Sequence, residues 1–357
     1  MGTAHGRRIV VVGATGNVGT SVLKALGEDP GVTSIVGVAR RVPDWTPVKT
    51  TWARADIGRE DTDLVRHFEG ADAVVHLAWL FQPTHDPALT WRTNVLGAVR
   101  VFEAAAAAEV PVLAYASSVG AYSPGPGRRT VDESWPTHGW PEAAYCREKA
   151  YLERVLDGYE REHPQIRVVR MRPGFLFKEQ AAAEQRRLFM GPLVPRRLVR
   201  PALLPVVPDV SGLYFQALHT DDAADAFRRA LTRDVRGAFN LAAGPPIDAR
   251  VLAELLGARV VRLPRAAARR ALAAAWRLRL VPASPDLFEA VLRLPLMDAS
   301  RARAELDWRP RHTGVEAIEE FLGGLRSGAG METAPLTART PAGRWGELVR
   351  TRVGRTP

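Results

Sequence analysis

The chain has 357 residues but only one cysteine, Cys146. A single cysteine excludes an intrachain disulfide and a cysteine-based metal cluster, and it is typical of proteins from a reducing compartment. The sequence also lacks an apolar run near the ~18 residues that a membrane-spanning helix needs, and it shows no signal-peptide core with a cleavage site. We therefore expect a cytoplasmic protein with no metal site and no stable membrane insertion.

Lysine is also scarce, since 45 of the 49 basic residues are arginine and only four are lysine. With 39 acidic residues the net charge is +10, which by itself would suggest a nucleic-acid partner. Three stretches, 186–200, 259–279 and 326–357, together carry +16, so the rest of the chain is net acidic. Because arginine enrichment is general and no nucleic-acid motif accompanies it, we expect no nucleic-acid partner.

Three glycines follow the first apolar run of the chain. Residues 8–12 stop at the segment Gly13-Ala-Thr-Gly16-Asn-Val-Gly19, and apolar residues then recur at helical spacing. Such glycines let the backbone turn sharply and approach a pyrophosphate, whose charge is met by the amide groups that start the helix. A tight turn without a ligand is the alternative. The residues of this loop expected to bind a dinucleotide are Gly13, Thr15, Gly16, Asn17, Val18 and Gly19.

Basic residues follow the second apolar strand, 34–39. In a dinucleotide-binding fold, an acidic residue at this position holds the ribose hydroxyls of NAD, whereas an arginine accepts the 2′-phosphate of NADP. Arg40 therefore favours NADP, with NAD as the alternative. After a third strand near 51–55, Asp56 and Ile57 are placed to meet the adenine. Asp56 is equally well explained as the N-cap of a helix over 59–68.

Strands and helices alternate through the first half of the chain. This alternation predicts a Rossmann-type α/β fold, a doubly wound parallel sheet with ligands at the carboxyl ends of its strands. We expect a dinucleotide-binding domain over 1–175, with returning elements near 213–243. A smaller, mainly helical C-terminal substrate lobe takes 176–212 and 244–325, and the basic tail 326–357 is expected to be loosely ordered. The expected elements are strands 73–77, 112–116 and 166–171 and helices 91–109 and 142–162.

A tyrosine and a lysine, Tyr145 and Lys149, lie one helical turn apart and so share a helix face. A free tyrosine has a pKa near 10, and an ammonium beside it stabilises the phenolate and brings the pKa toward the range of a general base. A lysine retained in so arginine-rich a chain suggests that a flexible ammonium is needed there. Ser118 follows the strand 112–116, where its hydroxyl can polarise a substrate carbonyl.

Further segments complete a pattern of motifs in a fixed order. They are Gly13–Gly19, Asp72–Ala78, Asn94–Gly97, Ser117-Ser118 with Tyr122, Tyr145 with Lys149, Arg172-Pro173, His219–Asp222, Phe239–Leu241 and Ser300–Pro310. Over about residues 8–323 the chain thereby resembles the extended short-chain dehydrogenase/reductases, the NAD-dependent epimerase/dehydratase group. The resemblance implies that Tyr145 is the general acid/base, that Lys149 tunes it and holds the nicotinamide ribose, and that Ser118 orients the substrate oxygen. It also implies that Asn94 supports the site from its helix.

The resemblance further implies cofactor contacts from Leu77, Ala78 and Pro173, and a homodimer paired through helices of the main domain. The chain departs from the family in two places. The residues after Ser118 lack the Thr-Asp-Glu run of dehydratases, which argues against sugar dehydration. After Pro173 the chain reads Gly174-Phe-Leu-Phe, where many sugar-nucleotide enzymes have Tyr-Gly-Pro, and this puts a nucleotide-sugar substrate in doubt.

Aromatic residues dominate the positions where the substrate is expected, which favours an apolar or planar carbonyl compound, although core packing is the more common role for such residues. The residues expected to contact the substrate are Trp79, Phe81, Tyr122 and Phe175.

Three further segments allow more than one interpretation. The arginines of 186–200 either bind a diphosphate or carboxylate or belong to a solvated loop. The amphipathic segment 266–280 is expected to pack in the small lobe, with membrane-surface binding as the alternative. Residues 345–353 are a candidate docking helix.

Three functions remain open at this point. The leading hypothesis is an NADP(H)-dependent oxidoreductase that acts on a carbonyl or alcohol carbon of a small molecule, with Tyr145 as general acid/base. The second is a nucleotide-sugar epimerase that uses the same serine, tyrosine and lysine. The third is a dinucleotide-binding sensor or scaffold without turnover, which has no need for all three of these side chains.

Overall fold

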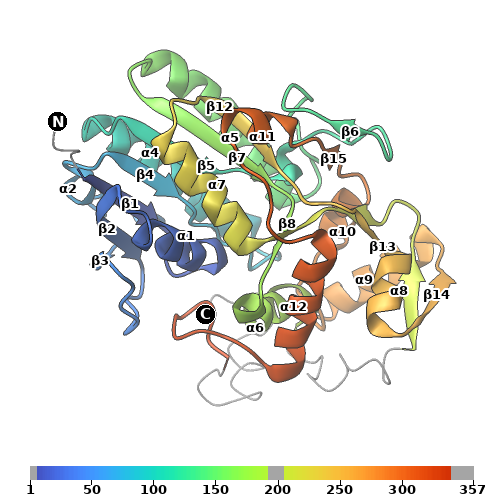
Figure 1. Ribbon diagram of the computed structural model, residues 1–357. Helices are drawn as coiled ribbons and strands as arrows, with labels where there is room; N and C mark the ends of the chain where they lie inside the picture. Colours follow the sequence, from blue (N-terminus) through green and yellow to red (C-terminus); the bar gives the residue numbers. More distant parts are fainter. Residues whose placement is uncertain (1–5, 192–204, 339–357) are drawn as a thin grey trace.

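The computed structural model describes residues 6–191 and 205–338. Its centre is a seven-stranded sheet with the order β12-β7-β5-β4-β1-β2-β3 (Figure 1). Every neighbouring pair of strands in this sheet is parallel, which confirms the predicted doubly wound α/β fold. The strands are β1 (Arg7–Val12), β2 (Val32–Ala39), β3 (Thr50–Arg54), β4 (Ala73–His76), β5 (Val112–Ala116), β7 (Arg167–Pro173) and β12 (Gly237–Leu241).

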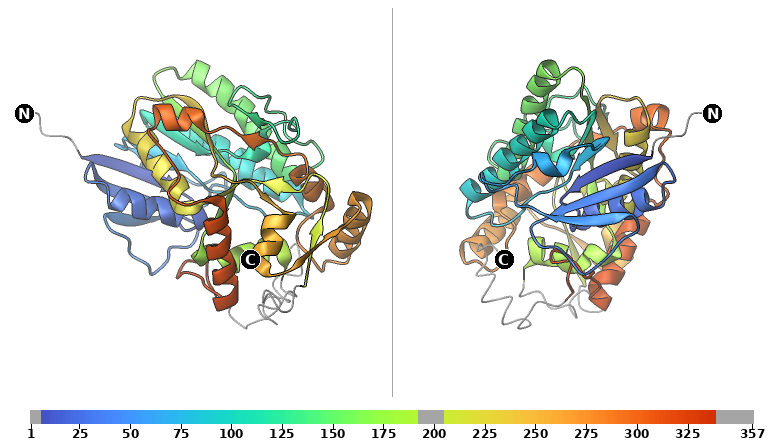
Figure 2. Two further views of the ribbon diagram at one scale, coloured as in Figure 1. Left: turned by 45° about the vertical axis from the view of Figure 1, so that its right-hand side comes forward. Right: turned by 90° about the vertical axis from the view of Figure 1, so that its left-hand side faces the viewer.

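Helices cover both faces of the sheet because its inner strands are apolar on both (Figures 1 and 2). Side chains alternate along a strand, so Ile9 and Val11 of β1 join the core on one face. Val10 and Val12 join the core on the other. The helices are α1 (Asn17–Gly27) and α7 (Thr220–Thr232) on the first face, and α2 (Val65–Phe68), α4 (Gly97–Ala107) and α5 (Ala144–Glu162) on the second.

The strand order reverses between β1 and β4. In open α/β sheets the chain connections diverge at such a point, which leaves a crevice at the carboxyl ends of the strands. The glycine-rich loop follows β1, the segment with Trp79 and Phe81 follows β4, and Ser117-Ser118 follows the adjacent β5. The fold thus brings three of the predicted motifs to one edge of the sheet.

The smaller lobe, where the substrate is expected to bind, has a small core of its own. Ile318, Phe321 and Leu322 of its last helix pack against Ala182 and Ile247. The lobe contains short helices and paired strands, which Figure 1 shows below and to the right of the sheet. Its helices are α6 (Ala182–Gln185), α8 (Ala249–Leu256), α9 (Arg265–Arg277), α10 (Pro285–Val291) and α12 (Gly314–Ser327), and its strand pairs are β8 (Phe175–Phe177) with β11 (Ala217–His219), β9 (Val206–Asp209) with β14 (Arg259–Arg262), and β10 (Tyr214–Phe215) with β13 (Ile247–Asp248).

Residues 300–308, which the sequence places in the smaller lobe, pack against the sheet domain instead. Ala302 and Leu306 on α11 (Ser300–Glu305) and its continuation lie in the sheet core, together with the fully buried Trp308. The indole N–H of Trp308 donates to the carbonyl oxygen of Asp222 in α7 at 2.8 Å. The family motif around Trp308 therefore anchors the late chain to the sheet domain. A further pair of short strands, β6 (Thr130–Val131) and β15 (Leu296–Met297), lies beside it.

Two predicted helices differ from the observed ones. The helix expected over 59–68 shrinks to α2, because the Asp56 carboxylate accepts the Gly58 N–H at 3.0 Å and holds the chain in a turn. The helix expected over 91–109 begins earlier, as α3 (Pro87–Thr90), and continues through a π-helical segment, Trp91–Leu96, into α4. A π-helical insertion is frequent at functional sites, and this one contains Asn94.

The tail expected to be loosely ordered is packed where the structure describes it. After α12, which ends at Ser327 and is capped by Gly328, residues 329–338 turn back toward the glycine-rich loop, and Leu336 is fully buried. The candidate docking helix over 345–353 lies outside the described residues. Among the helices that the structure describes, none has the length and apolarity required to cross a membrane.

Candidate active site

A cavity of about 1180 Å³ lies at the point where the strand order reverses and extends into the substrate lobe. Pockets for one small molecule are typically ~300–1,000 Å³, so this volume suits a dinucleotide together with a substrate. Every residue predicted to contact the cofactor lines the cavity. These residues are Gly13, Thr15, Gly16, Asn17, Val18, Gly19, Arg40, Asp56, Ile57, Leu77, Ala78, Lys149 and Pro173.

The glycine-rich loop has the geometry that a bound pyrophosphate requires. Gly13 has a φ of +86°, and a Cβ there would lie 2.5 Å from the backbone nitrogen of Ala78. A Cβ on Gly19 would lie 2.3 Å from the carbonyl oxygen of Gly13. Gly16 caps α1 without a side chain, so the first amides of the helix face the cavity without a side-chain acceptor. The loop therefore fits the diphosphate of a dinucleotide.

Arg40 and Asp56 lie on the cavity wall at the ends of β2 and β3. No helix starts at Asp56, so its interpretation as an N-cap is wrong, and its carboxylate instead closes the turn to Gly58. Arg40 is exposed, which leaves its guanidinium accessible to a ligand phosphate. Both positions agree with an adenosine site at this end of the cavity.

Tyr145 lies at the start of α5 with its ring inside an aromatic cluster. The ring of Phe81 stacks on it, with centroids 5.2 Å apart and an interplanar angle of 14°. Trp79 meets it edge-on at 5.6 Å. Burial raises the pKa of Tyr145 and outweighs the opposing hydrogen bond with Ser118. The phenol is therefore protonated at neutral pH, so the expectation that the neighbouring ammonium lowers its pKa is wrong for this structure, because burial dominates.

Lys149 is buried one turn further along α5. Its ammonium donates to the carbonyl oxygen of Ala116 at 2.7 Å and to the hydroxyl of Tyr115 at 3.3 Å. It also lies 3.5 Å from the centroid of the Trp79 ring, a cation–π contact. Burial lowers the pKa of Lys149 well below its ordinary value, against the attraction of Glu148 and neighbouring carboxylates. The ammonium is thus fixed beside the aromatic cluster and can give up a proton more readily than an exposed lysine.

Ser118 follows β5 and faces the same cavity. Its hydroxyl oxygen accepts the N–H of Gly120 at 2.9 Å, which fixes the side chain and leaves its own proton to donate. Ser118, Tyr145 and Lys149 are therefore brought together, as the sequence pattern predicted. In this arrangement a substrate oxygen can receive hydrogen bonds from a serine and a tyrosine at once.

Asn94 lies on its helix next to the site, as expected, but it does not line the cavity. It is buried beside the cavity, and its side chain holds the backbone of Leu80, accepting the N–H at 2.7 Å and donating to the carbonyl oxygen at 2.9 Å. Its amide also donates to Glu148, the neighbour of Lys149, at 2.8 Å. Asn94 is thus a positioning residue, which ties the segment of Trp79 and Phe81 to α5.

Tyr122 does not line the cavity and so does not fit the predicted role in substrate binding. It is 2% exposed, and its hydroxyl donates to Asn240 at 2.7 Å and accepts from Arg172 at 2.9 Å. The chain turns at 119–121 directly after Ser118, and this turn directs the tyrosine into the core. Tyr122 therefore supports the end of β5, while Trp79, Phe81 and Phe175 line the cavity as predicted.

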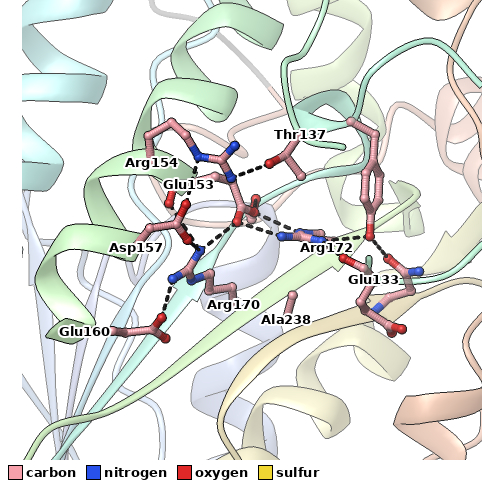
Figure 3. Close-up of polar contacts among 12 residues, drawn as sticks. Glu133, Thr137, Glu153, Arg154, Asp157, Glu160, Arg170, Arg172 and Ala238 are labelled. Carbon is pink, nitrogen blue, oxygen red and sulfur yellow. Dashed lines mark hydrogen bonds and ion pairs between the residues drawn. The ribbon is translucent and has the colours of Figure 1, made fainter. Parts of the chain in front are cut away.

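A buried ionic network links α5 to β7 (Figure 3). Glu153 of α5 is fully buried and accepts two hydrogen bonds from Arg172 at 2.9 and 2.8 Å and one from Arg170 at 3.1 Å. The hydroxyl of Ser117 donates to the same carboxylate at 2.5 Å. Burial acts to raise the pKa of Glu153, but Arg172, with Arg170 and Ser117, lowers it to about 2. The network joins α5, which carries Tyr145 and Lys149, to β7 and to the end of β5.

The half of the cavity that extends from Tyr145 into the smaller lobe, where the substrate is expected, is mostly apolar. The polar end of Gln82 is turned to the protein itself, since its amide donates to the carbonyl oxygen of Leu188 at 2.9 Å. Glu184 contributes a carboxyl group to this half of the cavity. Burial raises its pKa to about 7, although the positive charge of Arg187 acts to lower it. The apolar residues that line this half include Leu80, Leu188, Phe189, Leu272, Leu287, Phe288, Val291 and Leu294.

Sequence reasoning missed several residues of this site. Arg170 and Arg172 are charges inside an otherwise apolar strand, a pattern that indicates a buried carboxylate partner, but nothing in the sequence points to Glu153 as that partner. Lys178, buried, donates to Asn17, Thr20 and Ser21 at the start of α1. Because lysine is rare in this chain, the presence of Lys178 could have indicated a specific role for its ammonium. For the contact of Thr333 with the glycine-rich loop, described below, the sequence holds no signal.

Comparison with solved structures finds the same fold. A Thermus thermophilus UDP-glucose 4-epimerase in complex with NAD matches with a TM-score of 0.67 and 20% identity, over 89% of this chain and 99% of that one. A UDP-glucose 4-epimerase from Stenotrophomonas maltophila, with bound NAD and formylated UDP-arabinopyranose, matches with a TM-score of 0.67 and 19% identity, over 90% and 98% of the two chains. At these identities the likeness concerns the fold.

Sequence comparison finds relatives and a family. An uncharacterized protein of Mycobacterium tuberculosis is 26% identical over 329 residues, 88% of this chain and 83% of that protein. The L-arabinose 1-dehydrogenase (NAD(P)(+)) of Haloferax volcanii is 39% identical over 113 residues, which span 31% of this chain and only 41% of the dehydrogenase. The model of the NAD dependent epimerase/dehydratase family matches residues 9–242, more than half of the chain. The protein is thus an enzyme of the extended short-chain dehydrogenase/reductase type and belongs to the NAD-dependent epimerase/dehydratase family.

Proposed function

We propose that this enzyme is an NAD(P)-dependent oxidoreductase that acts on the carbonyl or alcohol carbon of a small, apolar or aromatic molecule, with a preference for NADP. The observation that carries the proposal is the apolar wall of the substrate half, which adjoins Tyr145. Within residues 6–191 and 205–338, the arginines that line the cavity are Arg40, Arg41 and Arg187. Arg40 and Arg41 belong to the adenosine end, and Arg187 donates to the carbonyl oxygens of Pro335 and Thr337. Among these described residues, little is left to bind the diphosphate of a nucleotide sugar, while Arg196, Arg197 and Arg200 of the same arginine-rich stretch lie outside the described residues.

The chemistry follows from the three assembled side chains. When bound, the nicotinamide supplies or accepts the hydride. Tyr145 donates its proton to the substrate oxygen as negative charge develops there, and Ser118 holds that oxygen by a second hydrogen bond. The positive charge of Lys149 stabilises the phenolate that remains. The rings of Phe81 and Trp79 hold the phenol in place and exclude water from it.

The direct test is to identify what the purified enzyme retains and turns over. Native mass spectrometry should find a freely exchanging NADP(H), and NADPH oxidation should be supported by apolar aldehydes or ketones from a panel. UDP-sugars assayed in parallel should give no interconversion. A tightly retained NAD together with a nucleotide sugar, and epimerisation of a UDP-sugar, would contradict the proposal and favour the epimerase.

Replacing Arg40 by alanine tests the cofactor preference. An arginine–phosphate hydrogen bond contributes about 1.5–3 kcal/mol when well formed, and because Arg40 is exposed we expect the lower end. The KM for NADPH should rise about tenfold while the KM for NADH changes little. Steady-state kinetics with both cofactors measures this. Arg54, exposed at the end of β3, provides the control as Arg54→Ala. An unchanged ratio of the two KM values in Arg40→Ala would show that Arg40 does not select NADP.

A further inference from the structure

The segment Ala329–Ala338, here called the strap, closes the described part of the chain. It follows α12 after Gly328, whose φ of +72° reverses the direction of the chain. The N–H of Met331 donates to the carbonyl oxygen of Leu336 at 2.9 Å, and the N–H of Leu336 donates to that of Thr333 at 3.1 Å. Leu336 is fully buried. The strap is thus a compact, internally bonded loop with its own apolar anchor.

One side of the strap is fixed to the glycine-rich loop. Thr333 is 2% exposed, and its hydroxyl donates to the carbonyl oxygen of Thr15 at 2.9 Å. Thr15 belongs to the segment whose backbone is shaped for a pyrophosphate, and Ala334 and Pro335 line the same cavity as that segment. The strap therefore forms a wall of the cavity next to the phosphate-binding loop.

The other side of the strap is fixed to the substrate lobe. Arg187, in the π-helical turn Arg186–Met190 that follows α6, donates through Nη2 to the carbonyl oxygen of Pro335 at 2.7 Å. Through Nη1 it donates to that of Thr337 at 2.8 Å. The planar fork of a guanidinium suits two such acceptors. Arg187 belongs to the stretch 186–200, whose arginines were considered as ligands of a diphosphate. In the structure Arg187 instead binds the backbone of the strap.

We propose that the strap is part of the cofactor site: it keeps the diphosphate of the bound dinucleotide against the glycine-rich loop, and it must detach from Thr15 and Arg187 for the cofactor to be exchanged. This inference rests on the proposed dinucleotide-dependent function. Because the strap joins the phosphate-binding loop to the substrate lobe, loading of the cofactor also fixes the lobe relative to the sheet. The residues that act here, Thr333 and Arg187, are positioning residues and take no part in the proton transfer.

Dissociation of NADPH from the full-length enzyme tests the strap directly. Rates are measured by stopped-flow fluorescence after mixing the NADPH complex with excess NADP. Removing one hydrogen bond in Thr333→Val should raise the dissociation rate constant about fivefold, and removing two in Arg187→Gln should raise it tenfold or more. The matched controls Thr232→Val and Arg326→Gln, at exposed ends of α7 and α12, should stay within twofold of the wild type.

Hydrogen–deuterium exchange supplies a readout independent of turnover. In the wild type, NADPH should slow exchange in peptides covering residues 329–338, and in Arg187→Gln this protection should be weaker at saturating cofactor. If NADPH binds but both variants keep the wild-type dissociation rate, the role of the strap is overturned and the proposed function is untouched. If the wild type binds neither NADPH nor NADH, the proposed function fails and the role of the strap with it.

Discussion

Tyr145→Phe should retain the fold and the cofactor affinity of the wild type but lose about 10²–10⁴-fold in kcat, the range that one general acid contributes. The ring keeps its contacts with Phe81 and Trp79, so only the proton donor is removed. Burial raises the pKa of the phenol, which makes Tyr145 a donor throughout the neutral range and makes its loss most severe for carbonyl reduction. Steady-state kinetics on the substrate found in the panel, together with NADPH titration, measures both parts of this expectation.

Tyr151→Phe provides the matched control for that experiment. Tyr151 lies on the same helix, six residues further on, but is 46% exposed and packs against Trp91 outside the cavity. Its replacement should leave kcat within twofold of the wild type. The acid/base assignment would be wrong if Tyr145→Phe retained turnover within about tenfold of the wild type.

The second large effect concerns stability. Glu153→Gln should lower the free energy of unfolding by about 3–5 kcal/mol, since removing one partner of a buried ion pair leaves the other charge uncompensated. Here the uncompensated group is the buried Arg172, since Arg170 keeps its ion pairs with Asp157 and Glu160. Urea unfolding at neutral pH, followed by circular dichroism, measures the change. Glu162→Gln, at the exposed end of α5, should not differ from the wild type.

The same carboxylate makes the stability depend on pH. Its pKa in the folded protein is about 2, below the ordinary 4.5, so its contribution is complete above pH 4.5 and is lost as the pH falls toward 2. A difference of this size corresponds to about 3 kcal/mol. Between pH 4.5 and 2, Glu153→Gln should therefore lose less stability than the wild type. An equal acid sensitivity in the two proteins would contradict this account of Glu153.

His76 affects the stability over a different pH range, and it provides an internal check when the stabilities of the wild type and Glu153→Gln are measured against pH. It is buried in β4 between the rings of Tyr115 and Phe102, and burial lowers its pKa to about 3 from the ordinary 6.5. The unfolded chain therefore binds a proton that the folded one does not, and stability falls as the pH decreases below 6.5. This part of the acid sensitivity should be the same in the wild type and in Glu153→Gln.

Local patterns in the sequence predicted what local geometry determines. The alternation of strands and helices, the glycines after β1 and the four-residue spacing of Tyr145 and Lys149 are each set within one or two elements. Each therefore appears in the structure where it was expected. The edge of the sheet then brings these motifs together, because the carboxyl ends of parallel strands meet there.

Contacts that depend on packing between distant segments were beyond such reasoning. Tyr122 belongs to a motif next to Ser118, yet a short turn sends the two side chains in different directions, one to the core and one to the cavity. The sequence predicted that Asn94 lies near the site, but not that it binds Leu80 and Glu148. These contacts depend on how two helices and a loop pack together. The hydrogen bond from Thr333 to Thr15 joins residues that no pattern relates.

That last contact bears on the order in which the protein is made. During synthesis the N-terminal part of a chain emerges and begins to fold first, and six of the seven strands of the sheet lie before residue 174. The edge strand β12 follows only after the first part of the lobe, and Thr333 follows later still. A nascent chain can therefore hold most of its sheet and all of its glycine-rich loop well before the strap exists. The wall of the cavity that the strap supplies is completed only after residue 333 has left the ribosome.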